Sequence, residues 1–460
     1  MEPSRGLPPP SDRLRRDLLA IHRAALRAAD PERILERDLQ GDAASGWTFR
    51  GQPLLPPPRS KGEPVFLFGA GKAAAALARG VRRALAGEAV RGRIIVKHGH
   101  RLEVPGVVVE EAGHPVPDAD SVEATKRLLA DLRETGGSGR VLVLLTGGAS
   151  ALLVAPAAGI TLEHKSQVSS LLLACGADIH EINTVRKHLS AVKGGGLIPL
   201  LPPGRAAALV ISDVIGDQLT SIGSGPATGD PTTFGDALGV LGKFGLVERV
   251  PEAVVRRFRD GVAGAVAETP DAPGEAVPHH IVASNFHSLR AAEAEASRLG
   301  YRTEVFGRDL AGEVHETARR FAHRLAVLGS DPAPGALLAG GELTLRVTGD
   351  GRGGRSQEFA LVAAGALEGV SGAALLAAGT DGTDGPTDAA GAFADGTSWS
   401  RARQRGVDPE RALRNNDSWS LFRATGDLLV TGPTGTNVMD LMVGLTAGDE
   451  VSGSGERNAD

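Results

Sequence analysis

The sequence predicts an α/β protein of two domains, the first built on a doubly wound parallel sheet. The chain has 460 residues, more than one hydrophobic core usually organises. Short apolar segments alternate with helical segments, as in β–α–β units. Glycine accounts for 62 residues, about twice the usual share of ~7%, and glycines gather after the apolar segments. Such positions suit tight turns and close approach of the backbone to ligands.

Composition excludes several classes of protein. The net charge of −5 provides no basic surface for nucleic acid. The single Cys175 excludes an internal disulfide and a cysteine-based zinc site. The sequence has no run of about 18 apolar residues, and its N-terminal segment lacks the apolar core of a secretory signal. We therefore expect a cytoplasmic protein with neither a nucleic-acid nor a membrane partner.

The first domain is expected over residues 11–268. Ser11 can cap an amphipathic helix over residues 12–30, and residues 40–62 form a connector. Strands and helices then alternate. Strands are predicted at the start of 64–85 and 140–156 and within 92–99, 106–118 and 205–217, and helices within 121–134, 161–177 and 179–201. In a parallel sheet the loops at the carboxyl ends of the strands form the binding site.

The second, smaller α/β domain is expected over residues 279–450. Residues 268–280 are rich in proline and acidic side chains and are predicted to link the two domains. A second β–α–β pattern begins at residue 280 and extends to 307. Residues 335–349 resemble a strand pair around a Gly-Gly turn, and two further strands end in glycine loops, within 372–382 and 427–437.

The segment "FGAGK" ends at Lys72, between a predicted strand and an alanine-rich helix. Its backbone amides could bind an anion at the helix N-terminus. The spacing does not match a P-loop. It does match G-x-G-x-x-A, but the acid expected after the next strand is absent, since that strand ends in Lys97. The alternative is a plain glycine turn with a solvated lysine.

Two further turns follow buried strands. In "TGGASALL", Gly147, Gly148 and Ser150 suit an anion-binding turn of backbone amides, whereas the glycine that a nucleophile elbow needs after Ser150 is missing. A simple tight turn is equally compatible. Asp213 in "ISDVIGD" directly follows a strand, where a carboxylate commonly binds a metal or a hydroxyl group. The alternative role for Asp213 is a capping residue.

Other charged positions adjoin glycines. Lys193 precedes three glycines and could bind substrate, or could be one of the cations that favour a helix C-terminus. Arg355, near Glu342 in sequence, is preceded by glycines that would let it approach a planar anion; a solvated hairpin is the alternative. Asn437, in "TGPTGTN", offers an amide to a phosphate or hydroxyl group.

The segment "GTDGTDGPTDAAG" places Asp381, Asp384 and Asp388 directly after a predicted strand. The spacing of the acids and Ala392 at the twelfth position exclude an EF-hand. A solvated turn or a loop that binds magnesium and phosphate remains. Cationic side chains, acids and glycine loops together supply what phosphoryl transfer requires.

The motifs together resemble the type II glycerate kinase family. The resemblance extends in order from about residue 14 to residue 448 and includes "FGAGKAA", "LLTGGASALL", "INTVRKHLSAVKGGGL", "VISDVIGD", "SGPATGDPTT", "GGELTLRVTG", "GGRSQEFAL", "GTDGTDGPTDAAGA" and "TGPTGTNVMDL". It implies a Rossmann-like N-terminal domain, a smaller C-terminal α/β domain and an active site in the cleft between them. It also implies transfer of phosphate from ATP to D-glycerate, giving 2-phosphoglycerate, with Mg²⁺.

The resemblance also implies roles for residues. Lys72, Arg355 and Asp213 would be catalytic, and Asp381 with Glu342 would hold Mg²⁺. The substrate-binding positions would be Gly147, Gly148, Ser150, Lys193 and Asn437. Met439 stands where relatives commonly carry asparagine. An NAD(P)H-dependent hydroxypyruvate reductase and a non-catalytic protein that binds small anions are the alternatives. The oligomeric state is open, with a homodimer as one alternative.

Overall fold

The computed structural model describes residues 12–271 and 277–448. Ser11, the central part of the predicted linker (272–276) and the last two residues of the predicted second domain lie outside the described residues. The chain forms two compact units. The parallel-sheet unit comprises residues 30–284 and 435–437, and the mixed-sheet unit comprises the described residues of 12–29, 285–434 and 438–448. The two α/β units confirm the predicted fold class.

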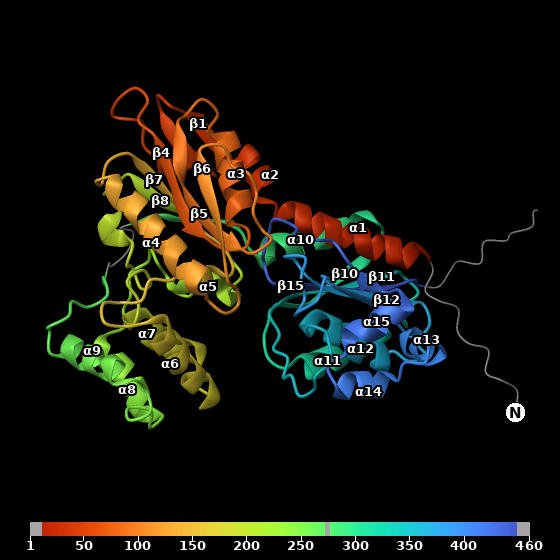
Figure 1. The fold of residues 1–460 in the computed structure, drawn as a ribbon. Helices are drawn as coiled ribbons and strands as arrows, with labels where there is room; N and C mark the ends of the chain where they lie inside the picture. Colours follow the sequence, from red (N-terminus) through yellow and green to blue (C-terminus); the bar gives the residue numbers. More distant parts are fainter. Residues whose placement is uncertain (1–11, 272–276, 449–460) are drawn as a thin grey trace, which may run out of the picture. The chain divides into compact units, whose positions relative to one another are not determined.

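The parallel-sheet unit contains six strands in the order β6-β5-β4-β7-β8-β9, all parallel to their neighbours (Figure 1). The strands are β4 (Val65–Ala70), β5 (Val90–Lys97), β6 (Val107–Ala112), β7 (Arg140–Leu145), β8 (Ala206–Ile211) and β9 (His279–Ala283). Every residue of β7 and β8 is buried, as expected for strands covered on both faces. The sequence order reverses between β4 and β7, where doubly wound sheets bind ligands.

Helices in this unit fall into two groups. The sheet-associated helices are α2 (Pro31–Asp38), α3 (Ala74–Ala84), α4 (Ala119–Glu134) and the short α5 (Ala149–Leu152). A second group, α6 (Leu162–Ala174), α7 (Ile179–His188), α8 (Phe234–Lys243) and α9 (Glu252–Val262), packs around its own apolar cluster, which includes Leu172, Val185, Leu241 and Phe258. Figure 1 shows these four helices together, away from the parallel sheet. Three single turns, η1 (Ile198–Leu200), η2 (Ile215–Asp217) and η3 (Ile222–Ser224), lie in the connecting loops.

Two sequence predictions for this unit were wrong in detail. The connector at 40–62 contains most of a small antiparallel sheet, formed by β1 (Leu39–Asp42), β2 (Gly46–Phe49) and β3 (Gln52–Leu55). The helix predicted over 179–201 ends at His188. It cannot continue through the glycine run, because Gly194 and Gly195 have φ angles of 55° and 79°.

The mixed-sheet unit has strand order β10-β11-β15-β12-β13-β14. Its strands are β10 (Arg302–Leu310), β11 (Gly335–Gly341), β12 (Ala373–Gly379), β13 (Gly391–Asp395), β14 (Leu428–Leu429) and β15 (Asp440–Thr446). Only β10 and β11 pair in parallel; the other neighbours are antiparallel. The strand pair predicted over 335–349 was wrong, since β11 ends at Gly341 and no second strand follows it there.

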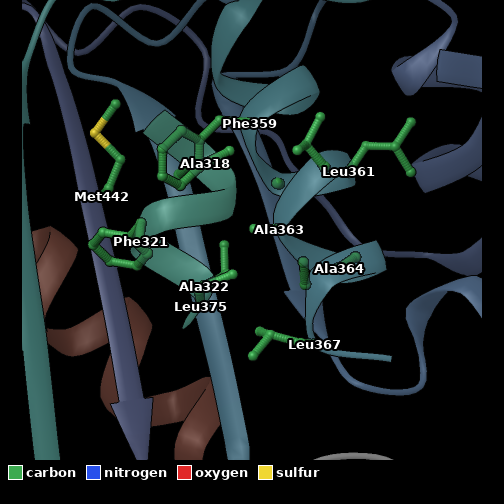
Figure 2. Packing of buried hydrophobic residues seen from close by; sticks show 14 of the residues in the cluster. Ala318, Phe321, Ala322, Phe359, Leu361, Ala363, Ala364, Leu367, Leu375 and Met442 are labelled. Carbon is green, nitrogen blue, oxygen red and sulfur yellow. The ribbon is translucent and has the colours of Figure 1, made fainter. Parts of the chain in front are cut away.

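Helices cover both faces of the mixed sheet. On one face, α1 (Asp12–Ala28) and α10 (Asn285–Arg298) share an apolar cluster with β11, β12 and β15. On the other face lie α11 (Val314–Leu328) and α12 (Arg355–Ala366). Figure 2 shows Phe321 of α11 and Phe359 of α12 near Met442 of β15, and their rings meet edge to face at 5.4 Å. The remaining helices are α13 (Ser398–Gln404), α14 (Pro409–Arg414) and α15 (Ser418–Thr425).

The division of the chain differs from the predicted boundaries at two elements. α1 was assigned to the first domain, but Leu18 and Ile21 belong to the mixed-sheet core, and Ser288 Oγ of α10 donates to the Ala25 carbonyl at 3.0 Å. β9 was assigned to the second domain, but it pairs with β8 in the parallel sheet. Among the helices of residues 12–271 and 277–448, none is long and apolar enough to cross a membrane.

Candidate active site

The turns that follow β4 and β7 are bound to each other. The Lys72 amide donates to the Gly147 carbonyl at 2.8 Å, and the Ala73 amide donates to Thr146 Oγ1 at 3.1 Å. Gly71 has a φ of 140°, and a Cβ there would overlap the Thr146 hydroxyl. A glycine is therefore required where the two turns meet. Lys72 thus stands at the point where the strand order reverses, the predicted place for a ligand.

Gly147, Asp213 and Asn437 converge beside this turn. Asn437 Nδ2 donates to Asp213 Oδ2 at 3.1 Å, so the segment 435–437 is bound to the loop after β8. A Cβ at Gly147 would overlap both Asn437 Nδ2 and Asp213 Oδ2. Next to it, a Cβ at Gly148 would lie 3.3 Å from Cγ of Lys72. Five of the predicted site residues, Lys72, Gly147, Gly148, Asp213 and Asn437, are therefore gathered at one edge of the parallel sheet.

One amide of the predicted anion-binding turn is already bonded within the turn. The Ala149 amide donates to the Thr146 carbonyl at 3.1 Å and so closes the turn. Ser150 is held from the other side, because Lys193 Nζ donates to its carbonyl at 2.7 Å and lies 2.9 Å from its hydroxyl. Lys193 is buried, and burial, with the nearby charges of Lys165 and Arg186, lowers its pKa well below the usual lysine value.

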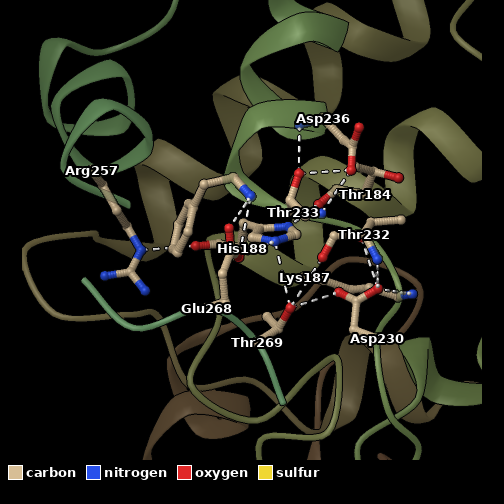
Figure 3. A network of polar contacts seen from close by, with 11 residues as sticks. Thr184, Lys187, His188, Asp230, Thr232, Thr233, Asp236, Arg257, Glu268 and Thr269 are labelled. Carbon is tan, nitrogen blue, oxygen red and sulfur yellow. Dashed lines mark hydrogen bonds and ion pairs between the residues drawn. The ribbon is translucent and has the colours of Figure 1, made fainter. Parts of the chain in front are cut away.

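A buried polar network supports the chain that leads to Lys193 (Figure 3). Lys187, near the end of α7, forms an ion pair with Asp230 at 3.1 Å, and the hydroxyls of Thr232 and Thr269 also donate to Asp230. A Cβ at Gly194 would lie 2.8 Å from Asp230 Oδ2, so the glycine after Lys193 passes close to the carboxylate. The network thereby fixes the position at which the chain leaves α7.

In the mixed-sheet unit, Arg355 contacts two of the acidic residues that follow or begin strands. Its Nε and Nη2 donate to the two carboxylate oxygens of Asp440 at 2.6 and 3.2 Å, and its Nη1 donates to Glu342 Oε1 at 2.6 Å. Asp440 begins β15 and is paired in register with Gly341 of β11 and Gly379 of β12. The glycines before Arg355 were expected to admit a planar anion, and the planar anion found there is the carboxylate of Asp440.

The acids of "GTDGTDGPTDAAG" have distinct positions. Asp381 follows β12, and its Oδ1 accepts from the amide and hydroxyl of Thr383 at 2.9 and 3.1 Å. Asp384 is buried and accepts from the amides of Ser356 and Gln357 at the N-terminus of α12, as a cap. Burial, followed by the charge of Asp440, raises the pKa of Asp384 to about 7.

The carboxylates at this edge can serve a divalent cation. Burial raises the pKa of Asp440; Arg355 opposes the shift, and the negative charges of Glu342 and Asp381 add to it. Mg²⁺ is commonly held by one or two carboxylates and completed by phosphate and water. In the part of the chain that the structure describes, one group of three close His, Cys, Asp or Glu side chains was found: His98, Asp118 and Asp120 on the surface. Glu342 and Asp381 are not part of that group, so a metal site at these two residues stays a prediction.

The sequence prediction missed two residues of these clusters. Asp440 was not among the predicted site residues, although it binds Arg355 through both oxygens. Its signal was an acid that directly follows the glycine and threonine loop "TGPTGTNVM". Ser224 lies with its Oγ 3.0 Å from Ser150 Oγ, across 74 residues of sequence, and nothing local in the sequence indicates that contact.

Comparison with known proteins places this chain in a family. Residues 17–259 match the family model described as "Domain of unknown function (DUF4147)", and residues 335–440 match the MOFRL family. A D-glycerate 2-kinase from Thermotoga maritima is 41% identical over 386 residues, which cover 83% of this chain and 90% of the relative. The chain belongs to the type II glycerate kinase family. This membership confirms the resemblance inferred from the motifs.

Other relatives in the type II glycerate kinase family include a solved structure. The crystal structure of a glycerate kinase from Thermotoga maritima superposes with a TM-score of 0.80 at 38% identity, covering 95% of this chain and 100% of that chain. A relative from Agrobacterium vitis that is named putative hydroxypyruvate reductase is 39% identical, covering 93% of each chain. The family thus includes proteins under both names that the sequence analysis considered.

Proposed function

We propose that this protein transfers the γ-phosphoryl group of ATP to D-glycerate and produces 2-phosphoglycerate. The observation that supports this best is the cluster of Lys72, Asp213 and Asn437 at the switch point of a parallel sheet. That cluster occurs in a chain 41% identical to a D-glycerate 2-kinase. The 2-position rests on the name of this relative.

The side chains of the parallel-sheet unit suit the acceptor and the transferred group. Lys72 would neutralise the charge on the equatorial oxygens of the γ-phosphoryl group in the transition state. Asp213, whose Oδ2 already accepts from Asn437, would orient or deprotonate the acceptor hydroxyl. The amides of Gly147 and Gly148 and the Ser150 hydroxyl would bind the carboxylate of glycerate.

Lys193 would act here through Ser150. Its amine is bonded to Ser150 and its pKa is lowered, so it suits positioning of that residue better than direct neutralisation of an anion.

The mixed-sheet unit would supply the metal site and a further cation. Asp381, with Glu342, would hold Mg²⁺, which would supply positive charge to neutralise the phosphate groups. Arg355 would offer a guanidinium whose orientation is fixed by Asp440 and Glu342. Because two carboxylates already fix this arginine, it requires little reorganisation when a phosphate arrives.

Reduction of hydroxypyruvate by NAD(P)H is the second candidate, because a relative 39% identical is named as such a reductase. The sequence opposes it. Dinucleotide-binding folds place an acid at the end of the second strand to bind the ribose, and β5 ends in Lys97. Loss of NADH absorbance that depends on hydroxypyruvate would support the reductase.

A coupled assay tests the kinase proposal. Purified protein is incubated with Mg-ATP and D-glycerate, ADP release is followed, and the phosphoglycerate isomer is identified by NMR. L-Glycerate serves as the matched control for the enantiomer. The expected result is ADP release that depends on D-glycerate, with 2-phosphoglycerate as product. Absence of ADP across a panel of small hydroxy acids would refute the proposal. The cytoplasmic location and the oligomeric state stay predictions.

A further inference from the structure

Three polar side chains form a cluster around Ser150, and substrate binding by Ser150 does not require its close contacts with both an amine and a second hydroxyl. Lys193 Nζ lies 2.9 Å from Ser150 Oγ, and Ser224 Oγ lies 3.0 Å from Ser150 Oγ on the other side. Ser224 Oγ in turn lies 3.4 Å from Asn183 Oδ1 of α7. Lys193 and Ser224 are buried, whereas Ser150 is only partly buried. The base and the second hydroxyl are thus shielded from water, and the central hydroxyl is the reachable one.

Lys193 Nζ is placed to donate to both the carbonyl and the hydroxyl of Ser150. Its Nζ donates to the Ser150 carbonyl at 2.7 Å, which orients the side chain. Burial and two neighbouring cations lower the pKa of Lys193 well below the usual value, which favours the neutral amine. In the 2.9 Å contact the amine donates to the Ser150 hydroxyl. A neutral amine can keep its bond to the carbonyl and direct its lone pair to that hydroxyl instead.

The backbone around Ser224 is held in an uncommon conformation. Ser224 has a φ of 63°, between Gly223 and Gly225 with φ of 59° and 63°. The amides of Gly194 and Gly195, directly after Lys193, donate to the carbonyls of Ser224 and Gly225 at 3.0 and 2.7 Å. A left-handed non-glycine residue costs free energy, and such residues gather at functional sites. The glycines after Lys193 therefore bind the backbone at Ser224 and hold it near Lys193.

We propose that Ser150 is a nucleophile activated by Lys193 and that the protein cleaves small carboxylic esters through an acyl–Ser150 intermediate. A nucleophile and a base at 2.6–3.2 Å can form an activated serine when the base is oriented, and lysine serves as the base in known Ser-Lys variants. Here the backbone carbonyl of Ser150 orients Lys193. The missing glycine of the nucleophile elbow does not exclude this chemistry, because the base here comes from the loop after α7. The inference does not depend on glycerate phosphorylation.

The reaction balances with water as the only co-reactant. Ser150 Oγ attacks the ester carbonyl carbon, its proton passes to Lys193 Nζ, and the carbonyl electron pair moves to oxygen. Collapse of the adduct breaks the bond to the alcohol oxygen, which takes the proton from Lys193. Water then attacks the acyl–Ser150 carbonyl, gives a proton to Lys193 and releases the acid, and the proton returns to Ser150 Oγ. The net change is ester plus water to acid plus alcohol.

The test uses the full-length protein and a fluorophosphonate reagent, with mass spectrometry to locate the adduct. We expect modification of Ser150 and none in Ser150→Ala. Lys193→Met should slow modification roughly 100-fold or more, the usual effect of removing a general base. Lys243→Met is the control, since Lys243 lies on α8, is mostly exposed and forms an ion pair with Glu181. It should react at the wild-type rate.

Hydrolysis of p-nitrophenyl acetate provides the second measurement. Wild-type protein should release nitrophenol, and prior modification of Ser150 should abolish that release. The wild-type modification rate should reach a plateau below the usual lysine pKa of about 10.4. An adduct at any other residue, an equal rate in Lys193→Met, or a rate that still rises at pH 10 would overturn the proposal. The pH profile is measured on the wild-type protein, so it tests Lys193 as the base even if Lys193→Met does not fold.

Discussion

Lys72 is the residue on which the proposed phosphoryl transfer depends most directly. Its backbone is fixed by the bond to Gly147, so its position is set before any ligand binds. We predict that Lys72→Ala lowers kcat for glycerate phosphorylation by roughly 10²–10³, the usual effect of removing one preorganised electrostatic contact. Lys126→Ala, on the exposed side of α4, is the control. If steady-state kinetics showed kcat of Lys72→Ala within a few-fold of wild type, Lys72 would not neutralise the γ-phosphoryl group as proposed.

A substitution of Asp381 tests its proposed role in holding Mg²⁺. Its carboxylate is oriented by the amide and hydroxyl of Thr383, so an asparagine can keep that geometry while it removes the charge. We predict that Asp381→Asn raises the Mg²⁺ concentration needed for half-maximal activity, because a neutral amide is a weaker ligand for a hard cation. The measurement is a Mg²⁺ titration at saturating ATP and glycerate. An unchanged titration midpoint would argue against metal binding by Asp381.

The turn after β7 depends on a glycine at position 147. A side chain there would overlap the Asp213 and Asn437 atoms that form the hydrogen bond across the site. Gly147→Ala should therefore separate these side chains and lower kcat/KM for glycerate by at least about tenfold, with a smaller loss of stability. Gly239→Ala, in α8, is the matched control, because a Cβ there meets no atom within 4 Å. Equal kinetics for both variants would contradict a role for the turn.

The N-terminus of α12 depends on Asp384. Its pKa is raised to about 7 by burial and then by Asp440, so the folded state favours the protonated form. The stabilising contribution of this carboxyl is therefore present at acid pH and is lost as pH rises from about 4 to about 7. We predict that the free energy of unfolding of wild type relative to Asp384→Asn falls over this range, by at most about 1.4 kcal/mol per pH unit. Urea unfolding at each pH measures it, and a difference that is constant or that widens with pH would contradict the prediction.

The elements of the parallel sheet were largely predictable, and the reason is local. β4, β7 and β8 are short apolar runs; β4 and β7 lead into glycine turns, and β8 leads directly into Ser212 and Asp213. These strands, and with them the positions of Lys72, Gly147 and Asp213, follow from the pattern. The end of α7 was not predicted, because the helix stops at His188, several residues before the glycine run that begins at Gly194. The pairing of Arg355 with Asp440 spans 85 residues and is set by the register of β15 between β11 and β12.

At the scale of the whole chain, sequence order does not decide which residues share a core. α1 precedes the parallel sheet in sequence, yet Leu14, Leu18 and Ile21 pack with α10 and with β11, β12 and β15. An amphipathic helix shows that it has an apolar face, but not which sheet covers that face. The two relevant stretches are separated by more than 250 residues, a separation that no local periodicity can bridge. The stability of the mixed-sheet unit should therefore depend on the beginning of the chain.

Ile21→Ala tests this dependence. Ile21 is fully buried, and truncation of a buried isoleucine to alanine costs about 2–5 kcal/mol. Because its neighbours are in the mixed-sheet core, hydrogen–deuterium exchange should show lost amide protection in α10, β11 and β15, with β7 and β8 unchanged. Arg13→Ala, on the exposed side of α1, should leave protection unchanged in both units. If β7 and β8 lost protection as much as β15, the two cores would unfold as one cooperative structure. That result would contradict the prediction that α1 stabilises the mixed-sheet unit alone.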